Sequence, residues 1–242
     1  MTAARTGTFY GVGVGPGDPE LLTLKAVRVL SHSDCIYVPS SHLSTQNYVA
    51  EVVKSHASPT CESVPVTFSL ADNSTQRQHH WHATAQQICA RLQAGQNVAF
   101  VTLGDPLLYS TYIYLLRALQ DISPTAKVET VPGISAFSAA AALTNSPLGE
   151  GLHPLTVIPA ANDLEQIRTL LAMGGGVVLM KIGPLLAQII ALIEQADALP
   201  RSVFVARAGL PEQHIETDLL RLRHAPPKTG NLAVIIVQAR RK

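Results

Sequence analysis

Residues 98–111 constrain the fold more than any other stretch of the chain. Residues 98–103 are apolar apart from one threonine, and Gly-Asp-Pro follows at 104–106. Such a run, bounded by turn residues, is typical of a strand buried on both faces of a parallel sheet. We expect a helix next, over 108–120, with Ser110 and Thr111 in its first turn. Ligands of open α/β sheets bind just past the carboxyl ends of strands, so this loop is a candidate site, although Asp and Pro are also ordinary turn residues.

A second loop of this kind lies near the N-terminus. A predicted strand, 8–14, runs into alternating glycines at 11, 13, 15 and 17, and Asp18 and Pro19 suit the start of a helix. The glycines allow a tight turn or close approach to a ligand. The glycine run matches neither the dinucleotide-binding motif G-x-G-x-x-G nor the phosphate-loop motif G-x-x-x-x-G-K-[ST]. The looser G-x-G-x-G of Rossmann methyltransferases fits, but the predicted second strand, 35–38, lacks an acidic residue at its end to hold a ribose.

Strand and helix patterns alternate along the whole chain, which predicts an α/β protein. Pro and Gly cluster around residues 145–151, so we expect two α/β domains, 1–146 and 147–242. About five strands are expected in each, in a parallel N-terminal sheet and a mixed C-terminal one. Further strands are predicted near 61–66, 128–131, 155–159, 176–181, 202–207 and 232–237, a hairpin-like stretch at 214–222, and helices near 47–56, 74–93, 135–143, 164–172 and 184–196.

Composition excludes several classes of function. Eighteen Lys and Arg against seventeen Asp and Glu leave a net charge of +1, which argues against a nucleic-acid partner. The chain has no apolar run long enough to span a membrane and no apolar leader, so we expect a cytoplasmic protein. Cys35, Cys61 and Cys89 are too scattered for disulfides or zinc and are expected in the core. The cluster His79, His80 and His82 lacks carboxylate or cysteine partners, so no metal site is predicted.

Four motifs together resemble the tetrapyrrole methylases, the class III S-adenosylmethionine-dependent methyltransferases. They are G-V-G-V-G-P-G-D-P-E-L-L-T-L-K-A from Gly11, G-D-P with Tyr109, V-P-G-I-S-A from Val131, and Met180-Lys181. The motifs span both halves of the chain in the family's order. Within the family, the first two are most similar to members that methylate C20 of precorrin-2 or of cobalt-factor II.

The resemblance implies two α/β domains with S-adenosylmethionine in the cleft between them, a tetrapyrrole substrate and a homodimer. The residues implied to contact the cofactor are Leu103, Gly104, Asp105, Tyr109, Ser110, Thr111, Ser135, Ala136, Met180, Ala208, Gly209, Gly230 and Asn231. The glycine-rich loop lies nearer the tetrapyrrole in such enzymes, and the residues implied there are Gly13, Gly15, Pro16, Gly17 and Asp18.

The chemistry of methyl transfer agrees with these residue types. Transfer from a sulfonium to carbon requires alignment of two reactants and no protein nucleophile. The new methyl group replaces a proton, and Asp105 is the candidate base by motif, although it could equally cap its turn. A polycarboxylate substrate requires cations, for which Lys181, Arg207 and Lys228 are candidates. Uroporphyrinogen III, another corrin intermediate, diphthine or ribosomal RNA stay open as substrates, as does a non-catalytic tetrapyrrole carrier.

Overall fold

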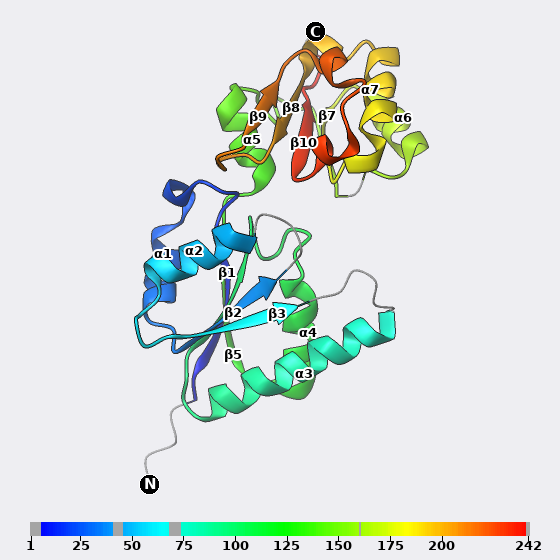
Figure 1. Cartoon of the computed structure of the whole chain (residues 1–242). Coiled ribbons are helices and arrows are strands. Elements are labelled where there is room, and N and C mark those ends of the chain that lie inside the picture. Colours follow the sequence, from blue (N-terminus) through cyan, green and yellow to red (C-terminus); the bar gives the residue numbers. More distant parts are fainter. Residues whose placement is uncertain (1–5, 41–45, 68–73, 160, 241–242) are drawn as a thin grey trace. The chain divides into compact units, whose positions relative to one another are not determined.

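The computed structural model describes residues 6–40, 46–67, 74–159 and 161–240, and its contacts divide the chain into two compact units (Figure 1). The first unit is residues 1–135 and the second is residues 136–242. Each unit contains one five-stranded sheet, as expected. The helix after residue 135 is grouped with the second unit, and the domain boundary expected after residue 146 stays a prediction.

The first unit contains a parallel sheet in the order β3-β2-β4-β1-β5. Its strands are β1 (Thr8–Gly13), β2 (Cys35–Ser40), β3 (Glu62–Thr67), β4 (Val98–Thr102) and β5 (Lys127–Val131), and its helices are α1 (Leu24–Ser31), α2 (Gln46–His56), α3 (Ser74–Gln93) and α4 (Tyr112–Ile122). Strands β4, β1 and β5 are neighbours, so the loops that follow them meet at one edge of the sheet. Parallel strands have their carboxyl ends on the same side.

Helices cover both faces of this sheet, which explains why β4 is buried at every position. Helices α1 and α2 lie on one face and α3 and α4 on the other (Figure 1). Phe9, Phe100 and Tyr112 form part of the core on the α3–α4 side, with ring centroids 5.9 Å apart for Phe9 and Tyr112. A strand between two helical layers is apolar throughout, which is the pattern that residues 98–103 display in the sequence.

The second unit contains a mixed sheet in the order β6-β7-β10-β8-β9. Its strands are β6 (Leu155–Ile158), β7 (Gly176–Met180), β8 (Ser202–Ala206), β9 (His214–Glu216) and β10 (Ala233–Val237), and its helices are α5 (Ala136–Thr144), α6 (Leu164–Ala172) and α7 (Leu186–Gln195). Strand β10 runs antiparallel to β7 and β8. The end of β7, the end of β8 and the beginning of β10 therefore lie at the same edge.

Two short segments differ from the expected elements. The helix expected over 19–30 is a 3-10 turn, Pro19–Leu21, followed by α1; Asp18 accepts from the Glu20 N–H at 2.8 Å, and Thr23 accepts from the Ala26 N–H at 3.1 Å. Two N-caps therefore replace one. The hairpin-like stretch 214–222 is strand β9 paired with β8, followed by a 3-10 turn, Leu219–Leu222.

Candidate functional site

Three loops are joined by backbone contacts at the carboxyl edge of the N-terminal sheet. The loop after β1 bonds to the loop after β4: the Val14 N–H donates to the Thr102 carbonyl at 3.0 Å, and the Gly104 N–H donates to the Gly15 carbonyl at 2.7 Å. Gly15 and Gly104 have φ of 75° and 73°, a conformation in which glycine is favoured. The Gly-rich loop and the Gly-Asp-Pro loop therefore form one structure.

Three glycines of these loops lie against one another, and two of them, Gly13 and Gly133, have no room for a side chain. A Cβ on Gly133, in the loop after β5, would lie 2.1 Å from the Gly104 carbonyl oxygen. A Cβ on Gly13 would lie 2.6 Å from the same oxygen and 2.7 Å from the Gly133 Cα. We call Gly13, Gly104 and Gly133 the glycine junction. Gly133 was absent from the predicted site residues, although it stands in the V-P-G-I-S-A motif.

The Asp105 carboxylate connects two of the loops. Its Oδ1 accepts from the Leu107 N–H at 2.9 Å, and its Oδ2 accepts from the Gly133 N–H at 3.0 Å. Each oxygen of the half-buried carboxylate thus has a backbone donor, and hydrogen bonds to an ionised acceptor are among the stronger ones in proteins. Asp105 fixes the loop after β5 to the loop after β4, which is the turn-forming role that the sequence left open.

The segment after this loop is wrongly assigned to a helix by the sequence. Tyr109 has φ of 54°, a left-handed conformation that an α-helix cannot contain, so α4 begins at Tyr112 instead of residue 108. Ser110 precedes the helix: its buried hydroxyl lies 2.9 Å from the Thr102 hydroxyl and accepts from the Tyr112 N–H at 3.1 Å. Thr111 stands at the N-cap position with an exposed side chain. Neither hydroxyl residue lies in the first turn, contrary to expectation.

Two tyrosines support the glycine-rich strand and loop. A Cβ on Gly11 would lie 2.2 Å from the Tyr112 ring, so this glycine makes room for a core side chain. The Tyr112 hydroxyl lies 2.9 Å from the Thr130 hydroxyl. Tyr48, on α2, donates to the Val14 carbonyl at 3.3 Å, and its burial raises its pKa to about 12. The sequence contains no signal for Tyr48, because its contact joins residues 34 positions apart.

A second group of predicted residues gathers at one edge of the C-terminal sheet. Lys181 follows β7 directly, Arg207 follows β8, and Leu232 precedes β10. All three adopt left-handed backbone conformations, with φ of 53°, 51° and 53°. The Arg207 N–H donates to the Leu232 carbonyl at 2.9 Å, and Met180 pairs with Val234. Each non-glycine residue with a left-handed backbone costs roughly 1–3 kcal/mol of conformational free energy, and such residues cluster at ligand sites.

The remaining predicted residues of the second unit lie in turns beside this edge. Gly230 ends the 3-10 turn Pro227–Gly230, and a Cβ on it would lie 2.7 Å from the Gly183 Cα. Asn231 follows, and its Oδ1 would lie 3.5 Å from a Cβ on Gly183. Ala208 is buried; the Gly209 N–H donates to the Gln213 side chain at 2.8 Å. Lys228 is exposed in the same turn as Gly230.

The other predicted residues of the first unit lie as follows. Gly13, Gly15, Pro16 and Gly17 are buried in the loop after β1, and Asp18 is half-buried. Leu103, half-buried, directly follows β4, and Ser135, buried, directly precedes α5. Ala136 is the first residue of α5 and belongs to the second unit.

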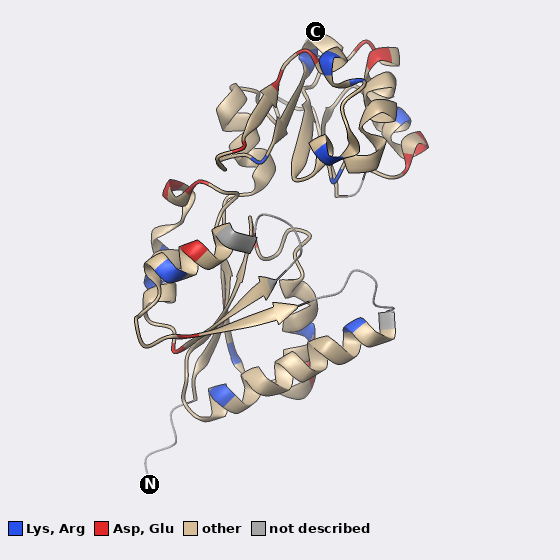
Figure 2. Cartoon of the chain, in the orientation of Figure 1, with Lys and Arg blue, Asp and Glu red and all other residues tan. Residues whose placement is uncertain are grey.

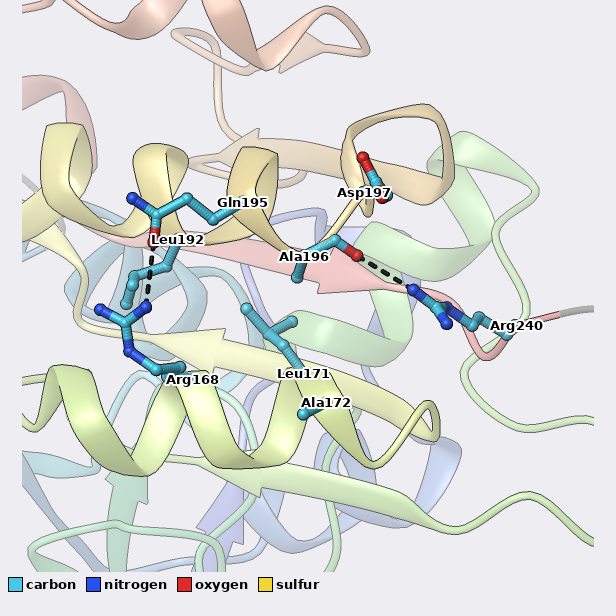
Figure 3. A pocket seen from close by; sticks show the side chains of 8 residues that line it. All are labelled: Arg168, Leu171, Ala172, Leu192, Gln195, Ala196, Asp197 and Arg240. Atoms are coloured by element: carbon cyan, nitrogen blue, oxygen red, sulfur yellow. Dashed lines mark hydrogen bonds between the residues drawn. The ribbon is translucent and has the colours of Figure 1, made fainter.

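A cavity of about 340 Å³ lies elsewhere, between α6 and α7 of the second unit (Figure 3). Its lining residues are Arg168, Leu171, Ala172, Leu192, Gln195, Ala196, Asp197 and Arg240, none of which is a predicted site residue. Arg168 donates to the Gln195 side chain at 3.0 Å, and Arg240 donates to the Ala196 carbonyl at 3.3 Å. Because this cavity lies away from every predicted site residue, we place the candidate site at the strand-end loops.

The cysteines and histidines form no recognisable centre in the described parts of the chain. Cys35 is buried in β2, and burial raises the pKa of its thiol to about 11. Cys89, half-buried on α3, packs against the core, whereas Cys61 precedes β3 and is only partly covered, so it is less of a core residue than expected. The predicted cluster of His79, His80 and His82 lies exposed on α3. Within the described residues, no three His, Cys, Asp or Glu side chains are grouped to bind a metal.

Charged side chains are dispersed over both units. Lys, Arg, Asp and Glu are scattered over the helices and loops of each unit (Figure 2). Among the described residues, no helix is both long and apolar enough to cross a membrane.

The sequence matches known proteins over most of its length. The model of the tetrapyrrole (corrin/porphyrin) methylases matches residues 8–222. The cobalt-precorrin-2 C(20)-methyltransferase of Salmonella typhimurium is 32% identical over 205 residues, 85% of each chain. The precorrin-2 C(20)-methyltransferase of a Sinorhizobium species is 33% identical over 218 residues, 87% of each chain.

Solved structures of this family share the fold. A cobalt-precorrin-4 methyltransferase superposes with a TM-score of 0.72 at 21% identity, covering 96% of this chain and 94% of that one. The uroporphyrin-III C-methyltransferase of Thermus thermophilus, solved with S-adenosylhomocysteine, gives 0.64 at 22% identity, covering 96% and 92%. Because the family model matches residues 8–222 and two relatives are more than 30% identical over at least 85% of the chain, the chain belongs to the tetrapyrrole methylases.

Proposed function

We propose that this protein transfers a methyl group from S-adenosylmethionine to C20 of precorrin-2 or its cobalt-containing counterpart, in cobalamin biosynthesis. The observation that carries the proposal is the similarity, over 85–87% of the chain, to two proteins named for C20 methylation. One of these acts on the cobalt form and the other is named without cobalt, so both substrates are included.

The strand-end loops of the first unit suit the cofactor. The glycine junction has no side chain at its centre, so backbone amides and carbonyls line this edge of the sheet. Backbone groups without side chains can approach a small charged ligand closely. When bound, S-adenosylmethionine would supply the electrophilic methyl group. We propose that it contacts Leu103, Gly104, Asp105, Tyr109, Ser110, Thr111 and Ser135, and, from the second unit, Ala136, Met180, Ala208, Gly209, Gly230 and Asn231.

The protein's main contribution would be alignment. Holding two reactants in a reactive geometry can supply roughly 7–11 kcal/mol of barrier reduction. Asp105 fits this task, because its carboxylate oxygens hold two adjoining loops at 2.9 and 3.0 Å. A role for Asp105 as the base that accepts the C20 proton stays a prediction: each oxygen already accepts one hydrogen bond, so the proton would have to bind at a remaining lone pair.

The substrate's carboxylates require cations. Lys181 follows β7 and Arg207 follows β8, the two strands on either side of β10, and Lys228 lies in the turn before β10. We propose that these residues bind acetate and propionate groups, and that Gly13, Gly15, Pro16, Gly17 and Asp18 approach the macrocycle. Local cations can bind a compact polyanion without an overall basic charge.

The test combines binding with product analysis. Purified protein is titrated with S-adenosylhomocysteine by calorimetry and then incubated with labelled S-adenosylmethionine and precorrin-2, cobalt-factor II or uroporphyrinogen III. One methyl group at C20 of either of the first two substrates is expected. Cofactor binding with methylation of uroporphyrinogen III alone would refute the C20 assignment. Tetrapyrrole binding without any cofactor binding would indicate a non-catalytic carrier.

A matched pair of variants tests the cofactor loop. Asp105→Ala removes the carboxylate that joins two loops, and we expect at least a tenfold loss of S-adenosylhomocysteine affinity, about 1.4 kcal/mol. Asp121→Ala, an exposed residue of α4, is the control and should bind normally. Unchanged affinity in a folded Asp105→Ala protein would remove this loop from the cofactor site.

We also propose a homodimer in the cytoplasm. The dimer rests on the family resemblance, and sedimentation velocity would measure it directly. The compartment is supported by three free cysteines, two of them partly exposed, a state that reducing conditions maintain.

A further inference from the structure

The loops of the glycine junction carry large apolar side chains that point away from the core. Leu107, in the loop after β4, is 56% exposed, and Ile134, in the loop after β5, is 36% exposed. Both follow strands that are neighbours of β1 at the carboxyl edge of the sheet. Single exposed apolar side chains are common on protein surfaces, but these two lie on loops that Asp105 joins at the carboxyl edge of a parallel sheet, where ligands of such sheets bind.

One carboxylate holds both side chains in place. Asp105 Oδ1 accepts from the N–H of Leu107 itself, and Oδ2 accepts from the N–H of Gly133, which directly precedes Ile134. A Cβ on Gly104 would lie 3.9 Å from the Ile134 carbonyl oxygen, so the two loops are in contact. A protein that needed only to end two strands could use polar residues here. These loops instead present apolar groups on a backbone fixed at both points.

The chemistry of these residues separates two ligands. Of the hydroxyl residues expected near the cofactor, Ser110 and Ser135 are buried at 9% and 8% exposure, and Tyr109 and Thr111 are exposed; Leu107 and Ile134 are exposed aliphatic groups of the same loops. A zwitterionic cofactor requires hydrogen-bonding partners, which exposed Leu and Ile side chains cannot provide. The flat hydrocarbon face of a macrocycle gains from contact with them, because apolar area is removed from water on both sides.

We propose that Leu107 and Ile134 form an apolar platform that contacts the face of the tetrapyrrole, and that Asp105 is the positioning residue of this platform. The inference rests on the proposed function and adds to it a substrate contact at the N-terminal sheet. The carboxylate groups of the substrate and its ring face are then recognised by different residues: cations for the former, this platform for the latter.

The platform is tested with the double variant Leu107→Ala/Ile134→Ala. We expect its tetrapyrrole dissociation constant, measured by absorbance titration with precorrin-2 or cobalt-factor II, to rise roughly tenfold as buried methyl and methylene groups are lost. S-adenosylhomocysteine affinity and melting temperature should match the wild type. Leu107→Met/Ile134→Met, which keeps apolar volume, should bind the tetrapyrrole nearly normally. Leu152→Ala, at a fully exposed position of the second unit, is the surface control.

Each other outcome overturns the platform. If the double variant binds tetrapyrrole as the wild type does, these side chains are not contacts. Equal losses for cofactor and tetrapyrrole, or a lower melting temperature, would mean that the residues pack within the protein or around the cofactor. If the wild type binds S-adenosylhomocysteine but neither tetrapyrrole, the proposed function fails and the platform fails with it; wild-type turnover with an unaffected variant refutes the platform alone.

Discussion

Gly133→Ala is the sharpest perturbation of the glycine junction. The substitution adds one methyl group, which would lie 2.1 Å from the Gly104 carbonyl oxygen and 2.9 Å from the Gly13 Cα. Non-bonded carbon atoms are most stable at about 3.5–4.0 Å, so the loops after β4 and β5 must separate by more than about 1 Å. All the nearest atoms belong to backbone, and no side chain can rotate away.

Two effects of different size follow. Inserting a methyl group into a packed site costs roughly 1–3 kcal/mol of unfolding free energy, which lowers the melting temperature by about 2–12 °C in a protein of this size. A displacement of about 1 Å at reacting groups can cost roughly 100-fold in rate. We therefore expect the variant to remain folded while its methyl transfer falls by about two orders of magnitude.

The assay compares melting temperature, S-adenosylhomocysteine affinity and transfer rate for Gly133→Ala and Gly149→Ala. No atom would lie within 4 Å of a Cβ on Gly149, so that variant should match or slightly exceed the wild type in stability. A Gly133→Ala protein with wild-type transfer and melting would refute the close packing of the three loops. A protein with wild-type transfer and a lower melting temperature would separate the junction from catalysis.

Three further predictions concern other parts of the molecule. Burial raises the pKa of the Cys35 thiol from 9.0 to about 11, so the unfolded chain loses this proton at a lower pH than the folded protein does. Raising the pH from about 9 to 11 should therefore lower the unfolding free energy of the wild type more than that of Cys35→Ala. An equal pH dependence of the unfolding free energy in the two proteins would contradict this. Met180→Asp, at the half-buried end of β7, should raise the cofactor dissociation constant with a native circular dichroism spectrum, whereas a collapsed spectrum would identify Met180 as a core residue. Raising salt should weaken tetrapyrrole binding far more than cofactor binding, and a double Lys181→Ala/Arg207→Ala variant should lose this difference; equal salt slopes in the wild type would exclude these cations.

The sequence by itself determined the layered α/β architecture and the location of the candidate loops. Apolar runs such as residues 98–103 can be satisfied only between two helical layers, and turn residues at their ends mark where ligands can approach. The burial of a strand can be predicted locally, from the apolar residues of that strand alone. The family motifs also lie in single loops, which is why they could be identified from residue order.

Tertiary structure decided how those loops act together. In the sequence, Asp105 is an ordinary turn residue. Only the strand order β4-β1-β5 places the Gly133 N–H 3.0 Å from its Oδ2. Tyr109 is a residue type that helices accept, but its backbone is left-handed, so α4 begins only at residue 112. Local helix propensity does not predict this conformation. Contacts among Gly13, Gly104 and Gly133 join residues about 30 to 120 positions apart. Such contacts depend on the order of the strands in the sheet, which cannot be predicted from the residues next to each position in the sequence.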